Sequence, residues 1–317
     1  MIDETSKPKV TGRALQNRMG RSGIALPSGC AILFGLPFLA TGVIAFALIG
    51  AYGTAEGVPL PVSLAFGAVF TAAGTYVIAS GVLGTVRKRR QRELALTQPE
   101  APWLADHPWD ITEAVDRPLG RVVKPVLLSA FLFVFLIPFN YLVFVSEEWA
   151  DELLALIFVY VFDAIWVTTV GYALYCLVRY LKFGASSLRF SSFPFFLGER
   201  LQVQFAFPEG LHDFRTLKAT LRCVEERFES PDGQSNEVRC YETWADTVCL
   251  EGGSLDAGDP VIALAFDIPT DARSTALAER PPVYWEIEIK ADLPGIDYKA
   301  TFLVPVYARP ENRENAS

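Results

Sequence analysis

Four long stretches of the chain contain almost no charged residues. They run from about Cys30 to Tyr52, from Val62 to Val86, from Pro125 to Ser146 and from Leu153 to Val178. A helix needs roughly 20 mainly apolar residues to cross the hydrocarbon layer of a bilayer, and each stretch is long enough. The loop between the first and second stretches is short, and so is the loop between the third and fourth. The pattern therefore predicts two transmembrane hairpins, over residues 30–86 and 125–179.

Beyond about Lys182 the hydrophobic pattern repeats every two residues. Apolar and polar residues alternate over 201–207, 217–223, 262–268, 283–289 and 298–306, and a further strand is expected over 237–250. Such alternation is typical of strands that bury one face, and turn residues such as Glu251-Gly252-Gly253 separate the runs. About seven strands predict an all-β sandwich over 186–308. The expected fold class is α+β, with four transmembrane helices followed by this sandwich.

The positive charges predict how the helices are oriented. Lys and Arg gather in the N-terminal tail (1–29), in a linker between the hairpins (87–124) and just after the fourth stretch. The loops 53–61 and 147–152, which close the hairpins, contain neither residue. Because cytoplasmic loops carry the excess of Lys and Arg, both termini and the sandwich are expected in the cytoplasm. The C-terminal tail (309–317) is expected to be disordered.

Composition supports a membrane protein and excludes several other classes. The 317 residues are 51% hydrophobic, and the mean hydropathy is +0.28, which is too apolar for an ordinary soluble domain. The net charge is -8, and no basic run is interleaved with aromatic residues, so nucleic acid is not an expected partner. The five cysteines form no CxxC pair, and there are only two histidines. No metal site and no cofactor are therefore expected.

The linker combines a basic cluster with two tryptophans. The cluster consists of Arg87, Lys88, Arg89 and Arg90. Each such cation near an anionic membrane surface contributes about 1 kcal/mol of attraction. Trp103 and Trp109 each follow a proline and are expected to place their indoles at headgroup level. We expect the linker to lie on the membrane surface, and a partner-binding loop is the alternative.

Asp163 is the sole charged residue in the fourth apolar stretch. Ionisable groups at membrane depth are costly and usually face the interior of a helix bundle. Ion pathways generally need several such groups, whereas the nearby polar residue here is Asn140 in the third stretch. An interhelical hydrogen bond between Asn140 and Asp163 is the favoured interpretation. The alternative is a small transporter or channel subunit that uses both residues.

Glycines recur at helical spacing in the first two stretches. Gly67, Gly74 and Gly81 form a strict seven-residue stripe, and Gly35 and Gly42 occur in the first stretch. Small residues on one face let helices approach closely. The stripe predicts packing between the two stretches, or between protomers of a homo-oligomer.

The soluble half offers no convincing catalytic group. His212 beside Asp213 is expected in a surface turn, and no nucleophile motif accompanies it. Glu225 and Glu226 are expected on a solvated strand face. The cysteines that fall on strands, Cys223, Cys240 and Cys249, are expected to be buried small hydrophobes. Of Trp244 and Trp285, one is expected to fill the core between the sheets.

Two segments resemble the β-sandwiches of the arrestin family. The run Phe196-Leu197-Gly198-Glu199-Arg200-Leu201-Gln202-Val203 is similar to a turned strand of those domains, and the strand after it matches Leu217 to Cys223. Residues 263–269 followed by 282–291 are similar to the family's Phe-x-Ile/Leu-Pro strand, loop and Tyr-Trp strand. The resemblance implies one arrestin-like (Ig-like) sandwich, whereas true arrestins have two.

The whole chain also resembles uncharacterised bacterial membrane proteins of the DUF3592-like type. The resemblance lies in the glycine-rich hairpin, the arginine run and the Pro-x-x-Pro-Trp linker, here Arg87 to Trp103. It implies a bacterial inner membrane location and no established activity.

These observations favour a membrane-anchored, non-enzymatic scaffold over an enzyme. Its sandwich would bind a protein partner at the inner leaflet, through loops or through an edge strand that pairs with an extended peptide. The candidate edges are the runs 196–205 and 237–250.

Overall fold

The computed structural model divides the chain into two compact units. It describes residues 12–15, 20–21, 28–54, 59–116, 118–145, 152–208, 214–229, 237–253 and 261–309. One unit, here called the helical unit, comprises Leu26–Arg89 and Pro118–Leu181. The other, the β unit, comprises Met1–Ala25, Arg90–Arg117 and Lys182–Ser317.

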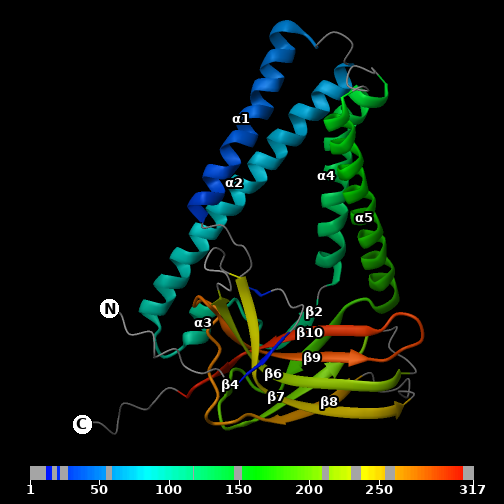
Figure 1. The fold of residues 1–317 in the computed structure, drawn as a ribbon. Helices are drawn as coiled ribbons and strands as arrows, with labels where there is room; N and C mark the ends of the chain where they lie inside the picture. Colours follow the sequence, from blue (N-terminus) through cyan, green and yellow to red (C-terminus); the bar gives the residue numbers. More distant parts are fainter. Residues whose placement is uncertain are drawn as a thin grey trace, which may run out of the picture. The chain divides into compact units, whose positions relative to one another are not determined.

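Among the described residues, four helices are long and apolar enough to cross a membrane. They are α1 (Ser28–Tyr52), α2 (Leu60–Thr97), α4 (Pro118–Phe144) and α5 (Leu153–Phe183) (Figure 1). Between 6% and 17% of the most apolar part of each helix is buried in the protein. Apolar side chains thus face outward on all four helices, as they do in lipid. The predicted spans and the α+β fold class are confirmed, and the chain is a multi-pass membrane protein.

Each helix extends beyond the apolar stretch that predicted it, and α2 and α4 extend the furthest. The helix α2 continues to Thr97, so the basic cluster Arg87–Arg90 is helical. The helix α4 begins at Pro118, seven positions before the expected Pro125. Charged residues such as Arg, Lys and Glu are good helix formers, and proline is tolerated at the first helical position. The apolar pattern therefore predicted the membrane-spanning part of each helix and not its full length.

Glycines bring α1 and α2 into close contact. A Cβ atom added to Gly42 would lie 2.5 Å from the backbone nitrogen of Thr71. One added to Gly74 would lie 2.7 Å from the Cα atom of Leu39. Neither position has room for a side chain. Packing between the first two predicted spans is confirmed, whereas a homo-oligomer through this hairpin stays a prediction.

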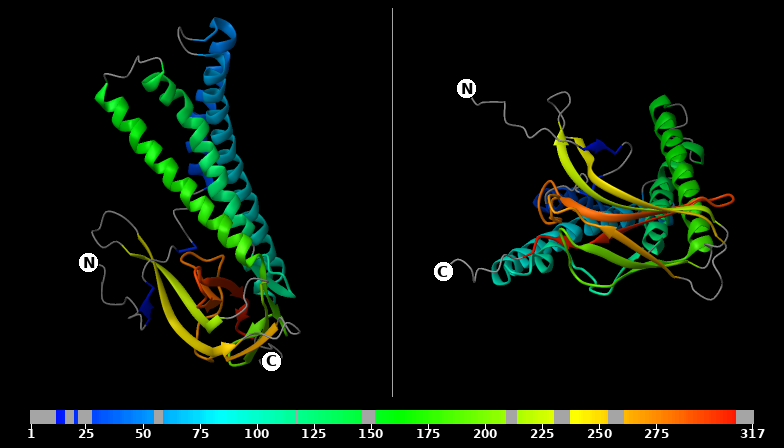
Figure 2. Two further views of the ribbon diagram at one scale, coloured as in Figure 1. Left: turned by 90° about the vertical axis from the view of Figure 1, so that its right-hand side faces the viewer. Right: turned by 90° about the horizontal axis from the view of Figure 1, so that it is seen from below.

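The β unit contains a five-stranded and a four-stranded antiparallel sheet (Figure 2). The first has the order β1 (Arg13–Ala14), β7 (Glu237–Gly253), β6 (Phe214–Glu229), β9 (Val283–Ala291) and β10 (Tyr298–Val304). The second has the order β2 (Glu113–Asp116), β3 (Ser186–Phe190), β5 (Arg200–Ala206) and β8 (Val261–Asp267). A short parallel pair joins β4 (Phe195–Phe196) to β11 (Val306–Tyr307).

Alternate residues of the two sheets form one hydrophobic core. Leu221 on β6 and Ile287 on β9 are fully buried, and so is Phe205 on β5. Trp285 is also fully buried, with the half-buried ring of Trp244 5.3 Å away between centroids. The expectation that one of these two tryptophans fills the core is confirmed.

The β unit extends beyond the predicted limits of 186–308. The N-terminal tail contributes β1, and the linker contributes the helix α3 (Pro102–Asp106) and the strand β2. A two-residue or four-residue strand is too short to show a period of two. These segments therefore gave no strand signal, although each pairs with a longer strand.

One of the two predicted edges is wrong and the other holds. The strand β5 lies between β3 and β8, so the run 196–205 does not form an edge. In the part of the chain that the structure describes, β7 is the outermost long strand of its sheet, and the two-residue strand β1 pairs with it at Tyr241 and Glu242. The strand also continues through the expected turn, because Gly253 pairs with Phe214.

Candidate functional site

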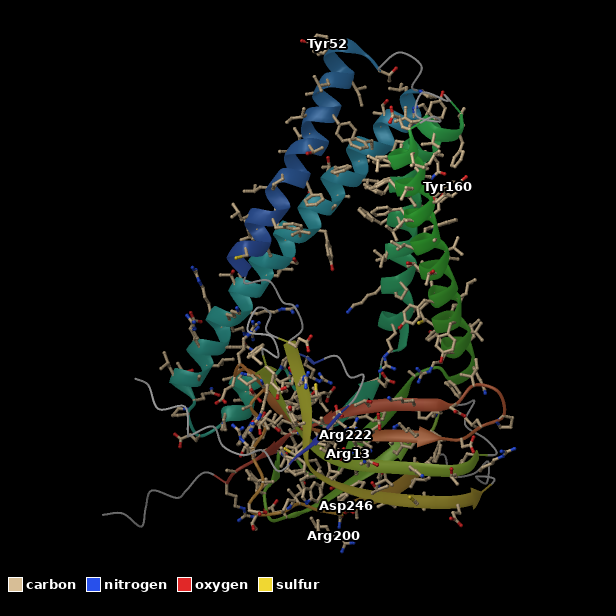
Figure 3. All side chains as sticks on the ribbon, viewed as in Figure 1. Arg13, Tyr52, Tyr160, Arg200, Arg222 and Asp246 are labelled. Carbon is tan, nitrogen blue, oxygen red and sulfur yellow. The ribbon has the colours of Figure 1, made fainter. Side chains whose placement is uncertain are left out.

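The face of the five-stranded sheet opposite the core carries a buried ion network. Arg222 projects from β6 (Figure 3) and is 6% exposed. Its guanidinium lies 2.7 Å from Glu286 Oε1 and 3.2 Å from Glu288 Oε1, both on β9. Glu242 on β7 lies farther away, at 3.9 Å. The network therefore connects the three central strands of the sheet.

Glu288 is held as a carboxylate by three cations. Burial raises its pKa, but Lys290 at 2.8 Å, Arg222 and Lys299 at 3.1 Å outweigh burial and lower the pKa to about 2. A buried charge that is paired in this way stays ionised at neutral pH. This arrangement of charges holds the central strands of the sheet together.

Glu225 and Glu226 are buried, which corrects the expectation of a solvated strand face. Glu225 is 8% exposed and Glu226 is fully buried. The carboxylate of Glu225 pairs with Arg227 at 2.9 Å and with Arg273 at 3.2 Å. Glu226 accepts a hydrogen bond from the backbone N–H of Arg21. Arg21 and Arg273 come from distant parts of the chain, so the local sequence did not reveal this burial.

A small apolar cluster lies on the face of the five-stranded sheet opposite the core. Val224, Cys240 and Tyr284 form its buried part, and Leu15, Leu277 and Leu303 pack against them. The cluster is separate from the core of the sandwich. Leu15 belongs to the N-terminal tail, so the tail takes part in the packing of the β unit.

The tail docks through both backbone and side chains. Arg13 and Ala14 pair with Glu242 and Tyr241, and the N–H of Leu15 donates to the carbonyl of Cys240 at 2.9 Å. The guanidinium carbon of Arg21 lies 5.1 Å from the centroid of the Tyr284 ring. Such cation–π contacts are typical where a cation rests on an aromatic face.

The linker packs on the β unit through the two tryptophans that we expected among headgroups. The Trp103 ring lies edge-on to Phe196 and Tyr307, with centroids 6.4 Å and 5.9 Å apart. The indole N–H of Trp109 donates to the hydroxyl oxygen of Tyr307 at 3.0 Å. Both indoles thus have protein partners and are half-buried, and their contact with lipid headgroups stays a prediction. Interaction of the cluster Arg87–Arg90 with lipid stays a prediction.

Asp106 anchors the linker and is almost fully buried. Its carboxylate accepts a hydrogen bond from the N–H of Ala278 at 2.6 Å and another from the hydroxyl of Tyr307 at 2.9 Å. Burial raises the pKa of Asp106 despite both hydrogen bonds, and it also raises the pKa of Tyr307. The sequence gave no sign of Asp106, because its partners lie some 170 to 200 positions away.

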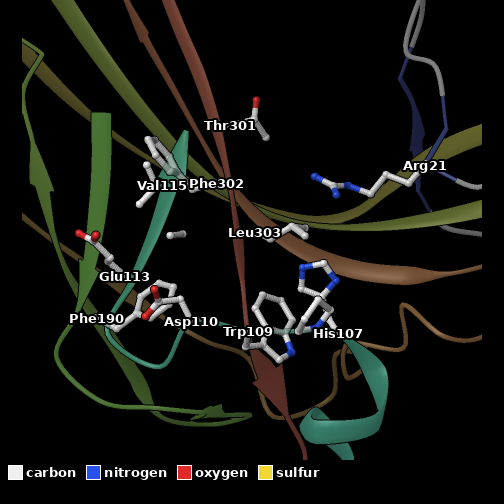
Figure 4. A pocket seen from close by; sticks show the side chains of 12 residues that line it. Arg21, His107, Trp109, Asp110, Glu113, Val115, Phe190, Thr301, Phe302 and Leu303 are labelled. Carbon is white, nitrogen blue, oxygen red and sulfur yellow. The ribbon is translucent and has the colours of Figure 1, made fainter. Parts of the chain in front are cut away.

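A cavity of about 400 Å³ lies between the tail, the linker and β10. Figure 4 shows Arg21 extending toward Leu303 and Thr301, with the His107 ring nearby. Burial lowers the pKa of His107, and the charge of Arg21 lowers it further. Asp110 and Glu113 also line the cavity. Because its charges are of both signs, the lining does not favour one class of ligand.

In the helical unit, Asn140 and Asp163 make the interhelical hydrogen bond that the sequence predicted. Asn140 on α4 donates from Nδ2 to Oδ1 of Asp163 on α5 at 3.2 Å. The same amide donates to the carbonyl of Leu136 at 3.2 Å. Asp163 thus has a structural partner at membrane depth.

No metal-binding group emerges among the described residues, since no three His, Cys, Asp or Glu side chains converge there. His212 and most of the tail 309–317 lie outside the described residues. Cys223 and Cys240 are buried as expected, and burial raises the pKa of Cys223 to about 11. Cys249 is exposed, contrary to expectation. It lies opposite Lys218 on the face of the sheet away from the core, whereas its neighbours Val248 and Leu250 pack against the core.

No protein-family model matches the chain, so the DUF3592-like resemblance has no support from such a match, and no curated protein sequence matches either. Among solved structures, part of the chain is similar to the sporulation control protein Spo0M from Bacillus subtilis. The two share 16% identity with a TM-score of 0.31, over 39% of this chain and 49% of Spo0M. The chain thus matches about half the length of that protein. This distant match carries no argument about function.

Proposed function

We propose that this protein is a membrane-anchored docking module without enzymatic activity. Its helices hold the β unit at the cytoplasmic side of a bacterial inner membrane, where the edge of β7 pairs with an extended segment of a partner protein. The observation that carries the proposal is that, among the described residues, most of this edge has no strand beside it. The strand spans Glu237–Gly253, and β1 pairs only with Tyr241 and Glu242.

The free edge has the properties of a strand-addition site. An uncovered edge presents backbone donors and acceptors that pair readily with another strand. Beyond Glu242 the exposed residues of β7 include Ala245, Asp246, Thr247 and Cys249. Asp246 lies on the core side of the sheet, opposite Leu221. A charge that points inward at an edge limits unselective pairing, and so it favours a specific partner.

The helical unit supports an anchoring role over a transport role. Its one acid at membrane depth, among the described residues of α5, is hydrogen-bonded to Asn140. The basic residues at the end of α2 and the start of α4 favour a cytoplasmic location for the adjoining β unit. The transporter alternative therefore gains no specific support.

Cys249 offers a direct test of the β7 edge. Of the five cysteines, only Cys30 and Cys249 are exposed. In a full-length Cys30→Ser protein, a thiol-reactive photo-cross-linker can therefore be attached to Cys249 alone. The control protein carries Cys30→Ser, Cys249→Ser and Arg200→Cys, because the Arg200 side chain is 65% exposed on the other sheet. Both proteins are irradiated in native membranes, and the cross-linked peptides are mapped by mass spectrometry.

The proposal expects one recurrent partner peptide on Cys249 that is absent from the Arg200→Cys control. Equal capture at both positions would show unselective contact and contradict the proposal. The absence of any adduct at Cys249 would likewise overturn it.

A further inference from the structure

We propose that the N-terminal tail is a resident ligand of the docking module and shows what kind of segment the module recognises. The surface that holds it, here called the tail-docking surface, consists of the β7 edge at Cys240–Glu242, the Val224–Tyr284 cluster and the Glu226 carboxylate. A partner of matching chemistry binds this surface when the tail leaves. That such a partner exists is part of the proposed function, on which this inference rests.

The backbone contact is that of an added strand. Arg13 and Ala14 run antiparallel to Glu242 and Tyr241, and Leu15 donates to Cys240 at 2.9 Å. These bonds do not depend on side-chain identity, so any extended segment can make them. They fix the direction of the ligand and the register at which its side chains meet the surface.

Leu15 supplies the apolar contact. It packs against the cluster of Val224, Cys240 and Tyr284, whose buried members are at most 2% exposed. A carboxylate in the position of Leu15 would lose this contact and bring a charge against apolar surface, which is strongly unfavourable. The surface therefore selects an aliphatic residue at this point of the ligand.

Gly20 and Arg21 supply the second contact. A Cβ atom on Gly20 would overlap Cγ1 of Val238 and lie 2.9 Å from Oε2 of the buried Glu226. Valine is stiff and Glu226 is enclosed, so neither neighbour can move aside at low cost. The N–H of Arg21 donates to Glu226, and its guanidinium rests on Tyr284. The surface thus favours a small residue followed by a cation.

The tail is held weakly enough to exchange. Among the described tail residues, the strand pairing with β7 consists of Arg13 and Ala14, and both are exposed. Segments with few buried contacts open with a small fraction of the global unfolding free energy. The expected partner is a segment that pairs with β7 next to an aliphatic residue and carries a cation six positions later, with a glycine directly ahead of that cation.

The test uses a fluorescent peptide with the sequence of residues 10–23 and the full-length protein in nanodiscs. A tethered ligand acts at an effective concentration of the order of millimolar, so the resident tail competes with the peptide. Leu15→Asp in the protein releases the tail, and Gly20→Ala does so by a different contact. Gly29→Ala is the matched control, because a Cβ atom there meets nothing within 4 Å. Trypsin cleavage after Arg21 reports release independently.

We expect the peptide to bind the Leu15→Asp and Gly20→Ala proteins at least about 10-fold more tightly than the wild type and the Gly29→Ala protein. Cleavage after Arg21 should accelerate in the same two variants. A peptide that itself carries Leu15→Asp should not bind. The inference is overturned if the tail is released and the peptide still fails to bind, or if neither variant releases the tail.

The two proposals fail separately. If the peptide behaves as expected but Cys249 captures no partner, the tail-docking surface is real and the docking of another protein is refuted. If Cys249 captures a partner equally well whether or not the tail is released, the docking module stands and the resident-ligand inference falls.

Discussion

The hydroxyl of Tyr307 donates a hydrogen bond to Oδ2 of Asp106 at 2.9 Å, and so joins β11 to the linker across 201 positions of sequence. Trp109 donates to the same hydroxyl oxygen, and Ala278 donates to the other carboxylate oxygen. Residues 90–117 of the linker are therefore part of the β unit. Any movement of the linker must break these three bonds.

Tyr307→Phe tests how strongly this anchor holds. The change leaves Asp106 with one donor fewer in a buried site and leaves the Trp109 N–H without its acceptor. We expect a loss of about 1–3 kcal/mol in the free energy of unfolding of the β unit, measured by urea titration with tryptophan fluorescence. Tyr241→Phe is the control, because its hydroxyl donates to Glu229 near the surface. Equal losses in both variants would refute the anchor.

The stability of the β unit should depend on the ionisation of Glu288. Its pKa is lowered from an ordinary 4.5 to about 2, because its cations favour the charged form more strongly than burial disfavours it. The stability that this group contributes is therefore present above pH 4.5 and is lost as the pH falls toward 2. Glu288→Gln should cost about 2 kcal/mol at pH 7, and its difference from the wild type should shrink on acidification.

Urea unfolding at several pH values between 7 and about 3 measures this difference. Glu237→Gln serves as the control, because the Glu237 side chain is 59% exposed and its pair with Arg239 is 3.7 Å long. That variant should follow the wild type at every pH. A Glu288→Gln effect that is constant with pH would contradict the predicted role of its charge.

The contact between α1 and α2 makes a prediction for paired glycine substitutions. Gly74→Ala places a Cβ atom 2.7 Å from the Cα atom of Leu39, and a backbone atom cannot yield without separating the helices. Overpacking of this kind costs about 1–3 kcal/mol. In α1 itself, Gly50→Ala meets nothing within 4 Å and should be neutral. Thermal unfolding in detergent should show a lower Tm for Gly74→Ala alone.

The helices and long strands were predictable because each carries its own period. The spans α1 and α5 have long apolar runs, and β5 and β9 alternate over at least seven residues. The pairing order of the strands was not predictable in this way. The run 196–205 looked like an edge because nothing in its local pattern reveals β3 and β8 on either side.

The site was harder to predict because its residues act over long sequence distances. Glu226 reads as a solvated acid until Arg21 covers it from 205 positions away. Trp103 and Trp109 have the composition of a membrane-surface segment, and only the folded structure reveals Tyr307 as their partner. Asn140 and Asp163 were predictable as a pair because they lie only 23 positions apart, on consecutive helices.

Asp163 distinguishes the anchoring role from the transport role. Asp163→Asn keeps an oxygen that can accept from Asn140, whereas Asp163→Leu removes it. We expect Asp163→Asn to be nearly neutral and Asp163→Leu to cost roughly 0.6–2 kcal/mol, as measured by thermal unfolding in detergent. In proteoliposomes, ion flux should not differ between the wild type and Asp163→Asn. The transporter alternative would be established if the wild type conducts ions and a folded Asp163→Asn protein does not. The variant keeps the hydrogen-bond acceptor and lacks the ionisable group, so the loss of flux would be due to that group.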